Sequence, residues 1–223
     1  MDMTPQRWKN TCQYLADVFG AQDTHLDALM HRAVGAGLPD IAVSPDVGRF
    51  LHILTKLGNA QNALEIGTLA GYSGIWIARA LAPGGTLHTI EIDPGHADFA
   101  QKAFEDAGVA DRVWIHRGAA LDILPDLAAK LGPSSIDVAF LDGIKTEYTD
   151  YFRLVKPLIR PRGLLLADNT LGSDDWWIDQ PEGESESRDA IDEFDRLVDA
   201  DEDFETVAVP IRQGILVAMR NSD

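Results

Sequence analysis

Two acidic residues, an amide and a lysine stand directly after two apolar runs in the second half of the chain. Asp142 and Lys145 follow the run 136–141, while Asp168 and Asn169 follow the run 163–167. If these runs are neighbouring strands of a parallel sheet, their carboxyl ends open on one ligand-binding edge. The two carboxylates and the amide oxygen would then converge. Hard oxygen ligands of this kind suit Mg2+, with water or substrate oxygens completing six positions.

Lys145 lies on the same predicted loop as the first of these carboxylates. A lysine close to a bound cation can serve as a general base. The alternative is a surface lysine that pairs with Glu147 or Asp150. For Asp168 and Asn169 the alternative is a helix cap or a turn, which these residue types often form. Neither histidine nor cysteine accompanies the group, which argues against zinc.

A second group of candidates surrounds the turn 65–74, whose sequence is EIGTLAGYSG. Glycine at such a turn lets a ligand approach the backbone, and the start of the next helix offers free N–H donors. Glu91 follows Gly67 by 24 residues at the end of the next predicted strand, where an acid can accept both ribose hydroxyls. The patterns G-x-G-x-x-G and G-x-x-x-x-G-K-[ST] are absent. An adenosine cofactor without a diphosphate fits better, and S-adenosylmethionine is the obvious candidate.

Strands and helices alternate along the segment that carries both groups. Strands are predicted at 63–66, 86–91, 112–116, 136–141 and 163–167, and helices at 72–81, 94–107, 121–131 and 146–159. This alternation predicts an α/β fold, with a doubly wound, mostly parallel sheet and helices on both faces. A helix over 187–198 is followed by strand-like runs at 205–211 and 215–219. Their short separation predicts an antiparallel hairpin at the end of the chain.

The first 60 residues are predicted to form three helices. Asp23 or Thr24 could cap the second helix, and Ser44 with Pro45 could open the third. Apolar residues at helical spacing predict the first helix, namely Trp8, Cys12, Leu15 and Phe19.

Length and composition are those of an ordinary globular domain, with 223 residues, 45% hydrophobic and 25% charged. We predict one domain over 1–223, with helices in 1–60 and an α/β core in 61–223. No apolar run approaches the roughly 20 residues that span a bilayer, and the first residues lack the apolar core of a signal peptide. A single cysteine, Cys12, excludes an intramolecular disulfide. These features favour a soluble cytoplasmic protein without a membrane partner.

The net charge of -17 is concentrated late in the chain. Between residues 168 and 205 there are 16 acids and two bases. Such a surface repels phosphate backbones, so a nucleic-acid partner is not expected. The alternative interpretation is a solvated acidic face that keeps the protein soluble.

Four separated motifs resemble those of the cation-dependent O-methyltransferases, which include catechol and caffeoyl-CoA O-methyltransferases. They are ALEIGTLAGYSGIWIARAL, TIEIDP, FLDGIK and LLADNTL, and the flanking SPDVGRFLHIL and VPIRQGILVAMR are similar too. The resemblance runs in order from about residue 40 to the C-terminus. It implies a Rossmann-like sheet of seven strands, the last antiparallel, and a homodimer. It also implies methyl transfer from S-adenosylmethionine to a hydroxyl of a small vicinal dihydroxy aromatic, with Mg2+, Mn2+ or Ca2+.

The resemblance further implies roles for individual residues. It implies metal ligands at Asp142, Asp168 and Asn169 and a catalytic lysine at Lys145, with Asp142 also catalytic and close to the methionine amino group. Ala70 departs from the Thr or Cys of many relatives. The implied cofactor contacts are Val43, Glu65, Gly67, Thr68, Ser73, Glu91, Ile92, Gly118, Ala119 and Asp142.

Two tryptophans, Trp176 and Trp177, follow the proposed ligand pair by a few residues and could cover an aromatic substrate. Lys145 and Asn169 are the other candidate substrate contacts. The alternative for the tryptophans is burial against the last helix or a subunit contact.

Other functions stay open at this point. One is a tRNA methyltransferase acting on a hydroxylated uridine, against which the negative charge argues. A CoA ester meets the same objection, although Arg7, Lys9, Arg32 or Arg49 could hold a phosphate. A nicotinamide oxidoreductase lacks its glycine motif, and a non-catalytic S-adenosylmethionine-binding protein would bind the cofactor without turnover.

Overall fold

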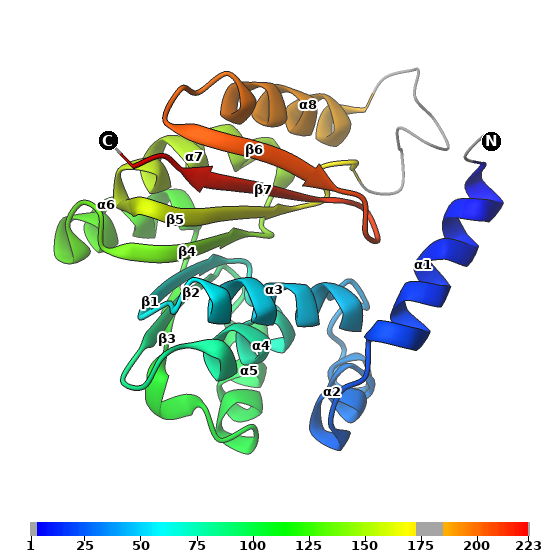
Figure 1. Ribbon diagram of the computed structural model, residues 1–223. Coiled ribbons are helices and arrows are strands. Elements are labelled where there is room, and N and C mark those ends of the chain that lie inside the picture. Colours follow the sequence, from blue (N-terminus) through cyan, green and yellow to red (C-terminus); the bar gives the residue numbers. More distant parts are fainter. Residues whose placement is uncertain (1–3, 173–184, 223) are drawn as a thin grey trace.

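The computed structural model describes residues 4–172 and 185–222 and is built on a seven-stranded sheet (Figure 1). The strand order is β3-β2-β1-β4-β5-β7-β6. Strands β1 to β5 pair in parallel, whereas β7 is antiparallel to both β5 and β6. This confirms the predicted doubly wound sheet with its antiparallel hairpin. The strands are β1 Asn62–Ile66, β2 Thr86–Glu91, β3 Val113–Arg117, β4 Ile136–Leu141, β5 Ile159–Asp168, β6 Phe204–Val209 and β7 Ile215–Arg220.

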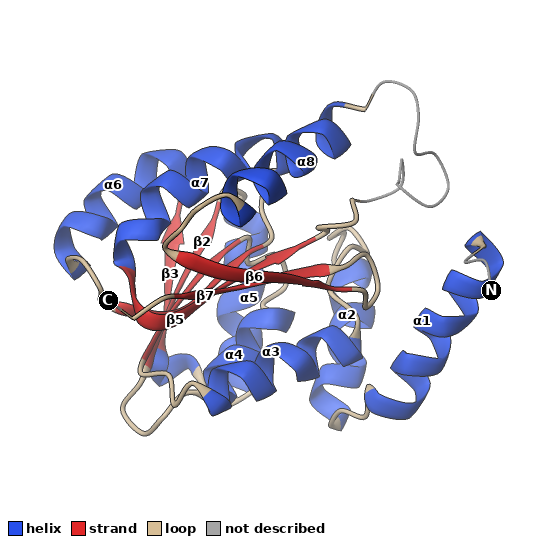
Figure 2. Ribbon diagram, turned by 45° about the horizontal axis from the view of Figure 1, so that its top comes forward, coloured by secondary structure: helices blue, strands red, loops and turns tan. Residues whose placement is uncertain are grey.

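Helices cover both faces of the sheet. Helices α6, α7 and α8 lie on one face, and α3, α4 and α5 lie on the other (Figure 2). Short 3-10 turns flank α7, and another precedes β3. The helices are α1 Pro5–Phe19, α2 Thr24–Gly35, α3 Pro45–Leu57, α4 Tyr72–Ala80, α5 Pro94–Asp106, α6 Ala120–Leu131, α7 Tyr148–Val155 and α8 Glu186–Asp199.

Two large apolar clusters hold these layers together. One joins the sheet to α6, α7 and α8 through residues such as Leu141 and Phe194. The other joins the opposite face to α3, α4 and α5 through residues such as Leu51, Ile75 and Phe104. Because the central strands are buried on both faces, they are nearly continuous apolar runs rather than alternating ones. This is why the strands were predictable as short hydrophobic segments.

The junction between α7 and β5 corrects the predicted boundary. A helix was predicted up to residue 159, but α7 ends at Val155 and β5 begins at Ile159. Pro157 lacks the N–H that a continuing helix requires, so the chain makes a 3-10 turn over Lys156–Leu158 instead. The register between β4 and β5 then shifts, because Ile136 pairs with Ile159 while Val138 pairs with Leu164.

The N-terminal helices begin where predicted. Asp23 caps α2 by accepting a hydrogen bond from the backbone N–H of Leu26 (3.0 Å). Ser44 occupies the N-cap position of α3, with Pro45 at its first position. Helix α1 buries none of its residues in the described part of the chain, and its predicted stripe is half-buried or exposed.

Among the described residues, no helix combines the length and the apolar character that crossing a membrane requires.

Phe194 tests the packing of α8 against the core. Its side chain is fully buried, and its ring meets those of Tyr148 (5.3 Å between centroids) and Phe152 (6.3 Å) edge-on. We expect Phe194→Ala to lower the free energy of unfolding by about 3–5 kcal/mol in urea titrations, because it leaves a large cavity. The control Phe19→Ala removes a ring that is 51% exposed and should cost about 0.5 kcal/mol or less. Equal losses for the two variants would contradict this packing.

Candidate functional site

A cavity of about 540 Å3 lies at the carboxyl end of the parallel strands. Its walls come from the β1–α4 turn, the end of β2, the loop after β4, Asn169, the β6–β7 loop and the segment 40–43. In the strand order, β1 has β2 on one side and β4 on the other. Successive strands are therefore added on one side of β1 up to β3 and on its other side from β4 onward, and such switch points are where doubly wound sheets bind ligands.

Gly67 brings the β1–α4 turn against the end of β4. Its backbone is left-handed (φ +96°), and a Cβ there would collide with the backbone oxygen of Asp142. The backbone N–H of Asp142 donates to the carbonyl of Ile66 (2.8 Å), so the two strand ends are also hydrogen-bonded. Glycine is therefore required here by the close approach of the Asp142 backbone, while the predicted approach of a ligand to this turn stays a prediction.

Glu91 clamps this turn from the neighbouring strand. Its Oε2 accepts hydrogen bonds from the backbone N–H groups of Thr68 (3.1 Å) and Leu69 (2.7 Å). Its Oε1 accepts from the N–H of Asp93 (2.9 Å), and Nδ1 of His96 lies 3.6 Å away. Although only 5% exposed, Glu91 lines the cavity, where its carboxylate can accept hydrogen bonds from hydroxyl groups of a ligand.

Glu65 lies beneath the turn instead of in the cavity wall. It is fully buried and accepts hydrogen bonds from Oγ of Ser73 (2.6 Å) and Oγ1 of Thr89 (2.7 Å). Burial raises the pKa of Glu65 to about 7, and the two hydrogen bonds oppose that rise. The direct cofactor contact expected at Glu65 is thus replaced by support of Ser73, which does line the cavity.

The other expected cofactor positions divide into two groups. Gly118 donates its N–H to the carbonyl of Glu91 (2.9 Å), yet neither it nor Ala119 is among the described residues that line the cavity. The candidate substrate contacts Trp176 and Trp177 lie outside the described residues. The positions that do line the cavity are Val43, Gly67, Thr68, Ser73, Glu91, Ile92 and Asp142.

Asp142 and Asp168 meet at the ends of two neighbouring strands, as the sequence predicted. Strands β4 and β5 are parallel, with Leu141 beside Ala167 in the register. Oδ2 of Asp168 accepts a hydrogen bond from Nη1 of Arg212 (3.1 Å), whereas Oδ1 is buried and has no hydrogen-bond partner in the described residues. Burial raises the pKa of Asp168, and the nearby Asp142 carboxylate raises it further.

Asn169 directly follows Asp168 at the end of β5 and is the third candidate metal ligand. Its backbone is left-handed (φ +65°), and its side chain lines the cavity. Nδ2 donates to Oε1 of Gln213 (2.6 Å), which leaves the amide oxygen Oδ1 as the remaining acceptor. The next residue, Thr170, donates its hydroxyl to Oδ2 of Asp195 in α8 (2.6 Å). The turn that carries Asn169 is thus held from both the β6–β7 loop and α8.

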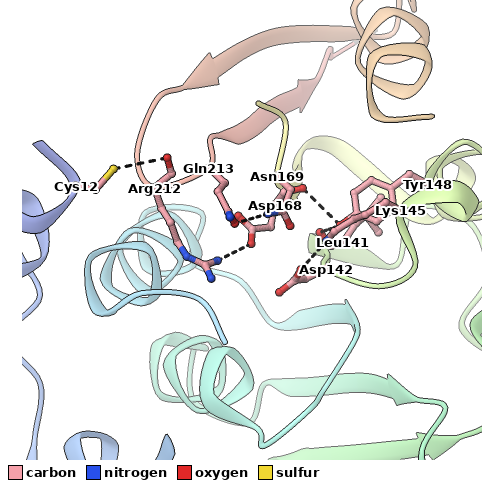
Figure 3. Close-up of polar contacts among 9 residues, drawn as sticks. All are labelled: Cys12, Leu141, Asp142, Lys145, Tyr148, Asp168, Asn169, Arg212 and Gln213. Atoms are coloured by element: carbon pink, nitrogen blue, oxygen red, sulfur yellow. Dashed lines mark hydrogen bonds and ion pairs between the residues drawn. The ribbon is translucent and has the colours of Figure 1, made fainter. Parts of the chain in front are cut away.

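Lys145 points to the same acidic group (Figure 3). Its Nζ donates to Oδ1 of Asp142 (2.9 Å) and to the hydroxyl of Tyr148 (2.7 Å). Tyr148 in turn donates to the carbonyl of Leu141 (3.0 Å). The alternative pairing with Glu147 or Asp150 is wrong, because Nζ of Lys145 pairs with Asp142 instead. Glu147 and Asp150 accept from Tyr151 and Arg153 respectively.

The donor set fits a hard divalent cation. Among the described residues there is no cluster of three or more His, Cys, Asp or Glu side chains. The candidate ligands are instead two carboxylates and one amide oxygen, from Asp142, Asp168 and Asn169. The buried, unpartnered Oδ1 of Asp168 is the kind of atom that a cation would satisfy.

The cavity residues that escaped the sequence prediction include His96, Arg212 and Gln213. His96 had a local signal, because it lies in the first turn of the helix that follows Glu91. Arg212 and Gln213 lie in the similar flanking segment VPIRQGILVAMR, but nothing local placed them at the site, because they reach it through the antiparallel pairing of β7 with β5. That pairing sets Asp168 beside Ile215, a few residues after both of them.

Comparisons with known proteins agree with this geometry. The O-methyltransferase family model matches residues 17–221. A catechol O-methyltransferase of Niastella koreensis is 44% identical over 169 residues, 76% of each chain. The structure of a Bacillus cereus O-methyltransferase in complex with SAH has a TM-score of 0.86 at 31% identity, covering 97% of this chain and 99% of that one. A Streptomyces achromogenes O-methyltransferase of tomaymycin synthesis, in complex with SAM, gives 0.85 at 31% identity, with 99% and 100% covered.

Gly67 gives a test of the close approach at the centre of the site. We expect Gly67→Ala to lower the free energy of unfolding by several kcal/mol, because it adds a steric clash to a left-handed backbone. Gly84 is the matched control, since its backbone is also left-handed (φ +79°) but a Cβ there meets nothing within 4 Å. Gly84→Ala should cost only about 1–2 kcal/mol. Similar urea unfolding curves for the two variants would contradict the close approach.

Proposed function

This chain belongs to the O-methyltransferase family of S-adenosylmethionine-dependent enzymes, and we propose that it methylates a hydroxyl of a vicinal dihydroxy aromatic with the help of a divalent cation. The observation that carries the proposal is one cavity with two chemically different sides. The glycine turn and Glu91 border one side, while Asp142, Lys145 and Asn169 border the other. The name of the Niastella relative supports a catechol-type substrate.

The cofactor side suits an adenosine with a positively charged sulfur. Glu91 would accept hydrogen bonds from the ribose hydroxyls, and Gly67 lines the same cavity. Val43, Ser73 and Ile92 line the same cavity. Asp142 lies between the two sides and offers a negative charge to the amino group of the methionine. S-adenosylmethionine supplies a methyl group on its sulfonium sulfur.

Asp142, Asp168 and Asn169 would hold the cation. When bound, it would lower the pKa of a coordinated phenol hydroxyl below the usual value of about 10. The buried oxygen of Asp168 that lacks a partner among the described residues supports this assignment. Mg2+ is the natural choice for such oxygen ligands, and Mn2+ or Ca2+ are the alternatives.

Lys145, as the neutral amine that a neighbouring cation would favour, would take the proton of the reacting hydroxyl on its nitrogen lone pair. Asp142 and Tyr148 hold its Nζ at the cavity wall, so the base is positioned before the substrate arrives. The deprotonated substrate oxygen then attacks the methyl carbon, the carbon–sulfur bond breaks, and the electron pair stays on the sulfur. The proton ends on Nζ of Lys145.

The alternative functions that the sequence left open differ in how they fit the family assignment. Membership of the O-methyltransferase family replaces the nicotinamide oxidoreductase hypothesis. A hydroxyuridine in tRNA and a non-catalytic cofactor-binding role stay alternatives. Both predict no methyl transfer to small aromatic diols, which makes that assay decisive.

We expect mass spectrometry to detect a methylated product when the protein is incubated with S-adenosylmethionine, Mg2+ and either 1,2-dihydroxybenzene or caffeic acid. Excess EDTA should abolish the product and added Mg2+ should restore it, because the cation is needed to acidify the phenol. Full turnover in excess chelator would exclude the cation-dependent mechanism. Cofactor binding without any methylated diol would favour the two alternatives.

Lys145→Met should lower kcat by about 100-fold or more, because a general base is lost. The Kd of S-adenosylmethionine, measured by calorimetry, should change far less. Lys102→Met is the control, since Lys102 is an exposed lysine of α5 and should leave kcat unchanged. A larger effect of Lys145→Met on the cofactor Kd than on kcat would remove Lys145 from the role of base.

A further inference from the structure

We propose that the substrate is an aromatic diol that carries a carboxylate, and that Arg212 binds this carboxylate. The inference deepens the proposed function and rests on it. Nothing in the four motifs of the sequence points to Arg212, which belongs to the loop between β6 and β7. The argument comes from the position of its side chain, its unused hydrogen-bond donors and the charges around it.

The loop that carries Arg212 is held in place from several directions. The backbone carbonyl of Arg212 accepts a hydrogen bond from Sγ of Cys12 in α1 (3.8 Å). The carbonyl of Gln213 accepts from the N–H of Leu171 (2.9 Å), and that of Gly214 accepts from the N–H of Thr170 (3.2 Å). Arg212 itself has a left-handed backbone (φ +48°). The guanidinium is thus presented to the cavity by a backbone tied to both α1 and the Asp168 strand.

Arg212 uses one of its side-chain donors within the described residues. A guanidinium has five N–H donors in a planar fork that matches a carboxylate. Nη1 donates to Oδ2 of Asp168 (3.1 Å), and the group makes no other hydrogen bond within residues 4–172 and 185–222. The side chain is 24% exposed and lines the cavity. A second, incoming carboxylate can therefore pair with it.

Arg212 and Lys145 lie on opposite sides of the Asp168–Asn169 strand end (Figure 3). Lys145 and Asp142 are on the side where the reacting hydroxyl is expected, and Arg212 is on the side of α1. A ligand that spans the cavity thus meets the base at one end and a guanidinium at the other. An acid such as 3,4-dihydroxybenzoate has its two hydroxyls and its carboxylate at opposite ends of the ring.

With a divalent cation bound at the proposed ligands, the charges beside Arg212 would favour an anionic group. The bases that line the cavity are His96, Lys145 and Arg212, and its acids are Asp40, Glu91 and Asp142. Glu91 and Asp142 belong to the proposed cofactor and cation sites. Exposed Asp40 makes no ion pair with Arg212 in the described part of the chain. If a divalent cation binds at Asp142, Asp168 and Asn169, it would share the negative charge of Asp168 with Arg212. The positive charge of Arg212 would then be only partly balanced.

The alternative is that Arg212 only positions Asp168. The two roles differ in what they do to ligand preference. A positioning role affects every diol equally, whereas carboxylate binding affects acids alone. Preference between an acid and its neutral analogue is therefore the informative measurement.

The experiment compares 3,4-dihydroxybenzoate with 3,4-dihydroxybenzamide, which has nearly the same shape but no charge. Binding is measured by calorimetry with Mg2+ and S-adenosylhomocysteine, so that no turnover occurs, and kcat/KM is measured in parallel with S-adenosylmethionine. The wild type should bind the acid about tenfold or more tightly than the amide, since a charge-assisted hydrogen bond contributes that much. Arg212→Gln should remove the preference, and Arg212→Lys should keep part of it.

Arg153→Gln is the matched control, because Arg153 is an exposed arginine of α7 that pairs with Asp150. It should leave the acid-to-amide ratio unchanged. Equal weakening of both ligands by Arg212→Gln, or no preference in the wild type, would overturn the carboxylate role of Arg212 while methylation of both diols leaves the proposed function intact. Methylation of neither diol by the wild type would instead overturn the proposed function.

Discussion

The close approach of β1 and β4 at their carboxyl ends is the constraint on which the rest of the site depends. Gly67 allows the backbone of its turn to lie against the carbonyl of Asp142, and the N–H of Asp142 is bonded to Ile66. Because of this contact, the β1–α4 turn and Asp142, which precedes the Lys145 loop, line the same cavity. Two chemically different halves therefore open into one cavity instead of two separate sites.

The antiparallel end of the sheet completes the other wall. Strand β7 inserts between β5 and β6, which brings the loop at 210–214 to the Asp168–Asn169 turn. Gln213 then orients the Asn169 amide, and Arg212 pairs with Asp168. Helix α8 holds the same turn through Asp195 and Thr170. The β6–β7 loop and α8 thus hold Asp168, Asn169 and Thr170, which lie at the end of the parallel strand β5.

Several buried acids are tolerated here because each has a specific partner. Glu65 is held by two hydroxyl groups, Glu91 by three backbone N–H groups and Asp168 by a guanidinium. Unpaired burial of a carboxylate would cost several kcal/mol. Left-handed backbones at Leu69, Asn169 and Arg212 accompany these acids. Such local strain is typical of functional sites, where the surrounding structure has to stabilise unfavourable conformations.

Sequence alone determined the order of strands and helices, the antiparallel hairpin and the strand-end positions of Glu91, Asp142, Asp168 and Asn169. These follow from local periodicity and from the rule that parallel strands open on one edge. Tertiary structure alone decided that Glu65 lies beneath its turn, that Lys145 pairs with Asp142, and that Arg212 and Gln213 reach the cavity. Those contacts depend on which strands pair and in what register, and that choice is made by packing between segments distant in sequence. Residues whose positions depend on local sequence can therefore be predicted from the sequence. Residues that reach the site through non-local strand pairing can be identified only from the folded structure.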